Sequence, residues 1–132
     1  MKISKKEDFA ILFMTVLARN FSQKYIPLSF ISSQTNLSLL FLKHIALDLK
    51  NDGLIISREG VQGGYRLAKN PQSISAAQIL RAINKGLVIP ACDHKICRVD
   101  KNNCLCLSFW NTFNRQMLQK LQHVKLSDIA GK

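Results

Sequence analysis

The sequence has few acidic residues and, outside one short stretch, no cysteine. Asp and Glu number 8 against 19 Lys and Arg, which gives a formal net charge of +11 at pH 7 over 132 residues. No phosphate-binding loop and no catalytic grouping of Ser, His, Asp or Cys is visible, which argues against an enzyme. The apolar run at residues 9–18 is too short to span a bilayer. Internal repeats and low-complexity segments are absent, so we expect one globular domain.

The positive charge is spread along the chain rather than gathered in a tail. Residues 1–70 carry ten basic and five acidic residues, and residues 71–132 carry nine and three. Such an excess predicts a polyanionic partner, either nucleic acid or an anionic membrane surface. The plainer alternative is a basic surface without a partner, which a pI near 9.9 makes the weaker interpretation.

The N-terminal stretch "MKISKKEDFAILFMTVLARN" resembles a secretory signal, with a basic start and an apolar run. Glu7 and Asp8 interrupt the basic start directly before the run, and the amphipathic pattern continues through Phe21. We therefore favour a core helix in a cytoplasmic protein over secretion, with no membrane partner.

All four cysteines lie between residues 92 and 106. Four residues separate Cys92 from Cys97, six separate Cys97 from Cys104, and one separates Cys104 from Cys106. Because a cytosolic protein keeps its thiols reduced, this cluster indicates metal or redox chemistry more than disulfides.

The first 53 residues predict helices and a tight turn. Residues 4–21 read as a helix buried on more than one side, and Pro27 stands where a second helix can begin. A turn at residues 35–37 leads to Ser38, a good N-cap, and Gly53 is placed to end the helix that follows. Two helices joined in this way are typical of a helix-turn-helix, although an ordinary helical hairpin is commoner.

A hairpin follows directly and favours a winged helix. Residues 54–58 and 65–67 read as strands around a turn at residues 60–64. Within the turn, Gly63 and Gly64 let the backbone approach a phosphate or a groove closely. The flanking cations are Arg58, Arg66 and Lys69.

The rest of the chain predicts further helices around the cysteine loop. Residues 73–86 read as a capped amphipathic helix, residues 107–124 as a second long helix, and the last eight residues as a short capped turn. The apolar face of the long helix is either core or a dimer interface. Its members are Phe109, Phe113, Met117, Leu118 and Leu121.

Four segments together resemble the Rrf-two type winged-helix transcription regulators. They are the first helix "MKISKKEDFAILFM", the recognition helix "LSLLFLKHIALDLKNDGLI", the wing "EGVQGGYRLAKNP", and the triple Cys92, Cys97, Cys104. The likeness covers essentially the whole chain. It implies a mostly α fold with a small β wing and a long C-terminal dimerisation helix.

The resemblance also implies a function and a division of the chain. We expect a homodimeric repressor or activator that binds a palindromic site in double-stranded DNA and senses nitric oxide, redox state or cluster supply. We expect one compact unit. Residues 1–86 would form the winged-helix region, residues 87–106 the cluster-binding loop, and residues 107–132 the dimerisation helix and tail.

The expected DNA contacts lie on the recognition helix and the wing. They are Ser38, Leu40, Phe41, Lys43, His44, Arg58, Gly63, Gly64 and Arg66. Leu39, Leu40 and Phe41 stand where base-reading polar groups are expected, so they either contact thymine methyl groups or simply pack. In the wing, Glu59 replaces the family's Arg and Val61-Gln62 replace its Pro-Gly. A carboxylate repels the minor groove, which leaves Arg58 and Arg66 as candidate replacements.

The family's ligand set implies that Cys92, Cys97 and Cys104 hold a [2Fe-2S] or [4Fe-4S] cluster through their thiolates. The neighbouring Lys95, Arg98 and Lys101 would offset the anionic charge and favour thiolate. The spacing is not that of a zinc ribbon. We favour the cluster over a metal-free thiol switch, and the thiol switch over structural zinc.

A fourth ligand has three candidates. Cys106 is nearest in sequence, but it lies where the long helix is expected to begin, and two residues that far apart on a helix point about 200° away from each other. His94 lies in the loop. Asp8 matches a carboxylate that in some similar proteins reaches the cluster from the partner subunit; alternatively it is a first-turn acid favoured by the helix dipole.

Two rival functions stay open. A small iron–sulfur electron carrier would explain the cysteines but has no need of a helix-turn-helix and wing. A regulator of the same fold controlled by a metabolic enzyme as partner protein would need no cluster at all.

Overall fold

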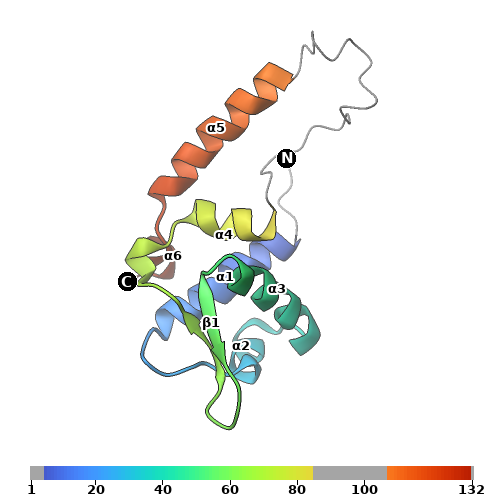
Figure 1. Cartoon of the computed structure of the whole chain (residues 1–132), viewed down its shortest axis with the longest axis vertical. Coiled ribbons are helices and arrows are strands. Elements are labelled where there is room, and N and C mark those ends of the chain that lie inside the picture. The colour runs from blue at the N-terminus through green and yellow to red at the C-terminus, as the bar shows by residue number, and fades with distance from the viewer. Residues whose placement is uncertain (1–4, 85–106, 132) are drawn as a thin grey trace.

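The computed structural model describes residues 5–84 and 107–131 of the 132-residue chain (Figure 1). Within these ranges the fold is mostly helical, with one two-stranded antiparallel sheet, as the sequence predicts. None of the helices there has the length and apolar character needed to cross a membrane. The elements in chain order are α1 (Lys5–Arg19), α2 (Leu28–Thr35), α3 (Leu39–Asn51), β1 (Ile55–Arg58), β2 (Gly64–Leu67), the short 3-10 helix η1 (Pro71–Ser73), α4 (Ala76–Ile83), α5 (Leu107–His123) and α6 (Leu126–Ala130).

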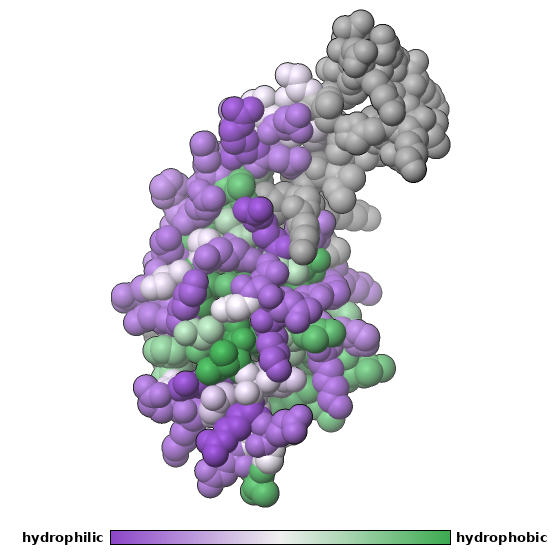
Figure 2. Space-filling model, in the orientation of Figure 1, coloured by the Kyte–Doolittle hydropathy of each residue, from purple (hydrophilic) through white to green (hydrophobic). Residues whose placement is uncertain are grey.

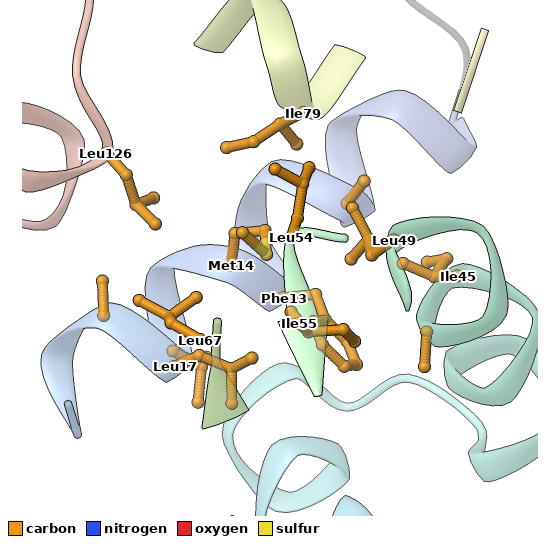
Figure 3. Packing of buried hydrophobic residues seen from close by; sticks show 14 of the residues in the cluster. Phe13, Met14, Leu17, Ile45, Leu49, Leu54, Ile55, Leu67, Ile79 and Leu126 are labelled. Carbon is orange, nitrogen blue, oxygen red and sulfur yellow. The ribbon is translucent and has the colours of Figure 1, made fainter. Parts of the chain in front are cut away.

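Helix α1 runs through the centre of the fold, which explains why its sequence is apolar nearly all round. It packs against α2, α3, α4, α6 and β2. Figure 3 shows Phe13, Met14 and Leu17 of α1 among side chains from α3, the wing, α4 and α6. All three are fully buried or nearly so. The predicted helix buried on more than one side is therefore confirmed.

Helices α2 and α3 form the helix-turn-helix unit, and local residues set their ends. Pro27 precedes α2, and Asn36 ends it with a left-handed φ of 59°, a conformation that Asn adopts more readily than most residues. Ser38 caps α3, because its hydroxyl oxygen accepts the Phe41 N–H at 3.2 Å. Gly53 follows the end of α3 with a φ of 74°. These predicted helix ends are confirmed.

The wing consists of β1 and β2, and it is attached to the segment between α1 and α2. The strands pair antiparallel, with Ile55 opposite Leu67. Ile26 forms an isolated β-bridge to the outer side of β2. Its N–H donates to the Tyr65 carbonyl oxygen at 2.7 Å, and the Tyr65 N–H donates to the Ile26 carbonyl oxygen at 2.8 Å. The wing is thereby fixed relative to the start of the helix-turn-helix.

The helix predicted at residues 73–86 is shorter than expected, and that prediction was wrong in its limits. Helix α4 begins at Ala76 because Ser75 and Gln78 form a capping box. The Ser75 N–H donates to Gln78 Oε1 at 2.9 Å, and the Gln78 N–H donates to Ser75 Oγ at 3.3 Å. At the other end Asn84 is extended, with φ of −136°.

Helix α5 stands out from the winged body with its first residues farthest away, and its last turn reaches the body, where α6 packs against α1 (Figure 1). The segment between them pairs with the residues before α4, since the Ala76 N–H donates to Val124 O and the Leu126 N–H to Ile74 O, both at 2.8 Å. Leu126 is fully buried in the same core as α1. The C-terminal turn predicted from the sequence is therefore part of the core.

Candidate nucleic-acid interface

Helix α3 has one buried and one exposed face, as its spacing predicts. The buried face holds Leu42, Ile45, Ala46 and Leu49. The exposed face holds Leu40, Lys43, His44 and Leu47, which recur every three or four residues and so lie along one side of the helix. Leu40 is 69% exposed and Leu47 is 57% exposed. Figure 2 shows apolar atoms beside hydrophilic ones at the right-hand side of the molecule, where α3 lies in Figure 1.

The three consecutive apolar residues at the start of α3 differ in their surroundings. Phe41 is half-buried, and its ring meets Phe9 of α1 edge to face with centroids 5.6 Å apart. Leu39 is 48% exposed and Leu40 is 69% exposed. Of the two predicted roles, packing therefore applies to Phe41, whereas the Leu40 side chain projects into solvent from the first turn of the helix.

The single acidic residue within α3 is paired. Lys6 Nζ of α1 lies 2.6 Å from Asp48 Oδ2, with both side chains partly exposed. The carboxylate is therefore offset by a cation on the neighbouring helix. Because Asp48 is paired with Lys6, it does not compete for Lys43, which lies on the exposed face of the same helix. This leaves the exposed face of α3 suited to an anionic partner.

The tip of the wing is open to solvent. Arg58, Glu59, Val61 and Gln62 are all exposed, and Val61 is fully so. The lowest point of the molecule in Figure 2, at the wing tip, is apolar. In the part of the chain that the structure describes, the Arg58 side chain has no hydrogen bond or ion pair, so it is available to a partner.

The two wing glycines have an internal role that the sequence did not reveal. A Cβ at Gly63 would collide with the Arg58 carbonyl oxygen, and one at Gly64 with the Ile26 carbonyl oxygen. Gly64 also has a φ of 146°, which L side chains rarely adopt. Close packing of the wing against its own chain is thus sufficient to require glycine here, whether or not DNA approaches.

Arg66 lies between the wing and the segment before α2. Its Nη1 donates to Gln23 Oε1 at 2.9 Å, and its guanidinium carbon lies 5.1 Å from the centre of the Tyr25 ring. The half-buried side chain leaves its buried Nε without a hydrogen-bond partner among the described residues. Gln23 and Tyr25, with the exposed Lys24 between them, are neighbours of the wing that the sequence did not predict.

Cys92, Cys97, Cys104 and Cys106, with His94, lie outside the described residues. In the two described ranges no group of three or more His, Cys, Asp or Glu is arranged to hold a metal ion. Asp8 is described: it lies in the first turn of α1 and is exposed.

Helix α5 carries an aromatic cluster on its surface. Phe109 is 59% exposed, and its ring centre lies 5.0 Å from that of Trp110 and 6.1 Å from that of Phe113. Farther along the predicted stripe, Met117, Leu118 and Leu121 are half-buried. The described residues therefore cover this apolar side only in part.

Comparison with known proteins gives a consistent picture. The model of the Rrf2 family, described as an iron-dependent transcriptional regulator, matches residues 3–132. The HTH-type transcriptional regulator IscR of Klebsiella pneumoniae (strain 342) is 26% identical over 131 residues, which are 99% of this chain and 80% of that protein.

Solved structures show the same likeness. CymR of B. subtilis, described as its global cysteine regulator, matches with a TM-score of 0.75 and 26% identity, over 99% of this chain and 97% of that one. The oxidized form of Staphylococcus aureus CymR matches with a TM-score of 0.74 and 28% identity, over 100% of this chain and 98% of that one.

Proposed function

Because the chain belongs to the Rrf2 family of transcriptional regulators, we propose that it is a DNA-binding repressor that senses redox state, nitric oxide or iron–sulfur status through an iron–sulfur cluster. The family's members regulate transcription and are not enzymes, and its winged-helix proteins bind DNA and typically dimerise. The observation that carries the DNA-binding part is the exposed face of α3, capped at Ser38 and followed directly by the wing.

The geometry of this face suits the major groove. Residues at the N-terminal end of a recognition helix contact base edges, and here they are Ser38, Leu40, Lys43 and His44. Arg58 at the wing is free to reach a phosphate or the minor groove. Arg66 is engaged by Gln23 and Tyr25, so we assign it to holding the wing in place and, through its remaining N–H groups, to a phosphate.

A homodimer would bring two such faces to one palindromic operator. The exposed aromatic cluster of α5 supports this helix as the interface, because Phe109 and Phe113 leave apolar surface that a second copy can cover. Two-fold symmetry then sets the recognition helices one turn of DNA apart, or a multiple of it. The distance between the two helices becomes the quantity that a signal must alter.

The donor chemistry of residues 87–106 suits an iron–sulfur cluster. Cys92, Cys97 and Cys104 supply thiolates, and a bound cluster would supply an anionic, redox-active group there. Asp8 of the partner subunit is the proposed fourth ligand, and its exposure in α1 leaves its carboxylate accessible. An oxygen ligand is harder and weaker than thiolate, so loss of this one bond would be an early response to a signal. Cys106 is the alternative ligand.

A metal-free thiol switch is the second candidate, favoured by the likeness to an oxidized form of CymR. Neighbouring cysteines would then form a disulfide on oxidation. The two candidates differ in what the reduced protein contains. A cluster protein carries iron and sulfide, whereas a thiol switch responds to oxidant with neither. A regulator that is controlled by a metabolic enzyme would need neither a bound cluster nor a response to oxidant.

The deciding experiment is purification from the cytoplasm without oxygen, followed by an absorbance spectrum, iron and sulfide analysis, and duplex binding by fluorescence anisotropy. We expect a coloured protein with iron and sulfide, and binding that weakens steeply with salt. A colourless protein that binds DNA until it is oxidised would favour the thiol switch. One tightly bound zinc ion without sulfide would contradict the cluster, and salt-independent or absent duplex binding in every state would contradict the DNA-binding function.

A further inference from the structure

The exposed face of α3 combines one cation with two leucines. A single exposed leucine needs no explanation. Here, however, Leu40 and Leu47 lie seven residues apart on one side of the helix, about two turns and about 10 Å apart, with Lys43 and His44 between them. The charge of the face favours nucleic acid, whereas the leucines offer no hydrogen bond to a base. The leucine at the end of the helix that meets base edges therefore needs an apolar partner within the groove.

The major groove contains one such group. Guanine, cytosine and adenine present hydrogen-bond donors and acceptors there, whereas thymine also presents its C5-methyl group. Leu40 is well placed to reach it, because it lies in the first turn of α3, two residues after the N-cap, and is 69% exposed. Phe41 is not available in the same way, since its ring is packed on Phe9.

Resting on the DNA-binding function proposed above, we infer that Leu40 selects thymine in each operator half-site by packing on its C5-methyl group. Recognition at this position is then by apolar contact, with Lys43 and His44 supplying the polar contacts on either side. Leu47 lies about two turns farther along the helix, away from the end that contacts base edges, and makes no such selection. The operator should accordingly contain a T·A pair that the wild-type protein requires. A variant with a shorter side chain at position 40 should no longer prefer T·A at that position.

The test compares thymine with deoxyuridine, which differs only by the missing methyl group. An operator is first selected from randomised duplexes by the wild-type protein. Each thymine is then replaced singly by deoxyuridine, and Kd is measured at fixed salt for the wild type, Leu40→Ala and Leu47→Ala. Both leucines are exposed, so both variants should unfold at the wild-type temperature.

We expect one thymine per half-site whose replacement by deoxyuridine weakens wild-type binding about fourfold. This factor corresponds to the burial of one methyl group, about 0.8 kcal/mol. Leu40→Ala should bind the two duplexes equally, and Leu47→Ala should keep the full difference. The inference fails if no thymine is methyl-sensitive, or if Leu40→Ala keeps the same sensitivity. In either case DNA binding itself stands. If no duplex is bound by any form, the proposed function fails, and this inference with it.

Discussion

Replacing Gly64 by alanine separates an internal role of the wing from a role in DNA contact. The residue has a φ of 146°, and a Cβ there would collide with the backbone of Ile26. A side chain in such a conformation costs about 1–3 kcal/mol. Avoiding the collision also breaks the two hydrogen bonds between Ile26 and Tyr65, each contributing about 1 kcal/mol. We therefore expect Gly64→Ala to destabilise the fold by about 3–5 kcal/mol.

Gly60 provides the matched control in the same wing. Its φ is 105°, but a Cβ there meets nothing within 4 Å, so Gly60→Ala carries the backbone strain alone. The difference of about 2 kcal/mol between the variants corresponds to about 6–10 °C in Tm for a chain of this size. Thermal and urea unfolding measure it. The packing argument is wrong if Gly64→Ala has the same Tm as Gly60→Ala and yet binds DNA more weakly than the wild type. The glycine then serves a phosphate contact instead.

Five further variants test the proposed DNA interface, the dimer and the cluster. Lys43→Ala should weaken binding to the operator more than binding to an unrelated duplex, because the proposed contact of Lys43 is with a base edge; anisotropy with both duplexes at fixed salt measures the difference. Phe113→Ser should give a monomer at micromolar concentration in sedimentation, while a wild type that is already monomeric would refute the dimer. After reconstitution without oxygen, Cys104→Ser should lose its iron and Cys106→Ser should keep it, and Asp8→Ala should hold a less stable cluster with a changed spectrum. If Cys106→Ser loses iron while Asp8→Ala is unchanged, Cys106 is the fourth ligand.

The helix ends that the sequence predicted correctly are those set by local residues. Ser38 caps α3 through an N–H three residues away, and Gly53 ends it with its own left-handed φ, so both signals lie within a few residues. The start of α4 was missed although its signal is equally local. Ser75 and Gln78 have the spacing of a capping box, which distinguishes Ser75 from Ser73 as the cap.

Contacts between distant segments could not be predicted in this way. The Arg66 side chain meets Gln23 across 43 residues of sequence, and Ile26 pairs with Tyr65. No periodicity relates these positions. Hence Arg66 and Gly64 could be read only as partners of DNA, whereas the structure also gives them partners within the chain.

The contacts between α1 and α3 limit how strongly a ligand at Asp8 could control DNA binding within one subunit. The turn that carries Asp8 meets the recognition helix through Lys6–Asp48 and Phe9–Phe41. The ion pair is partly exposed, so its contribution is at most about 1 kcal/mol, and the ring pair contributes about 0.5–1.5 kcal/mol. Together they can transmit at most about 2.5 kcal/mol, within the usual range of allosteric coupling and equal to a change of at most about 70-fold in affinity. If the protein is the cluster-bearing dimer proposed above, a larger difference in DNA affinity between its cluster-bound and cluster-free forms has to arise from the spacing of the two recognition helices.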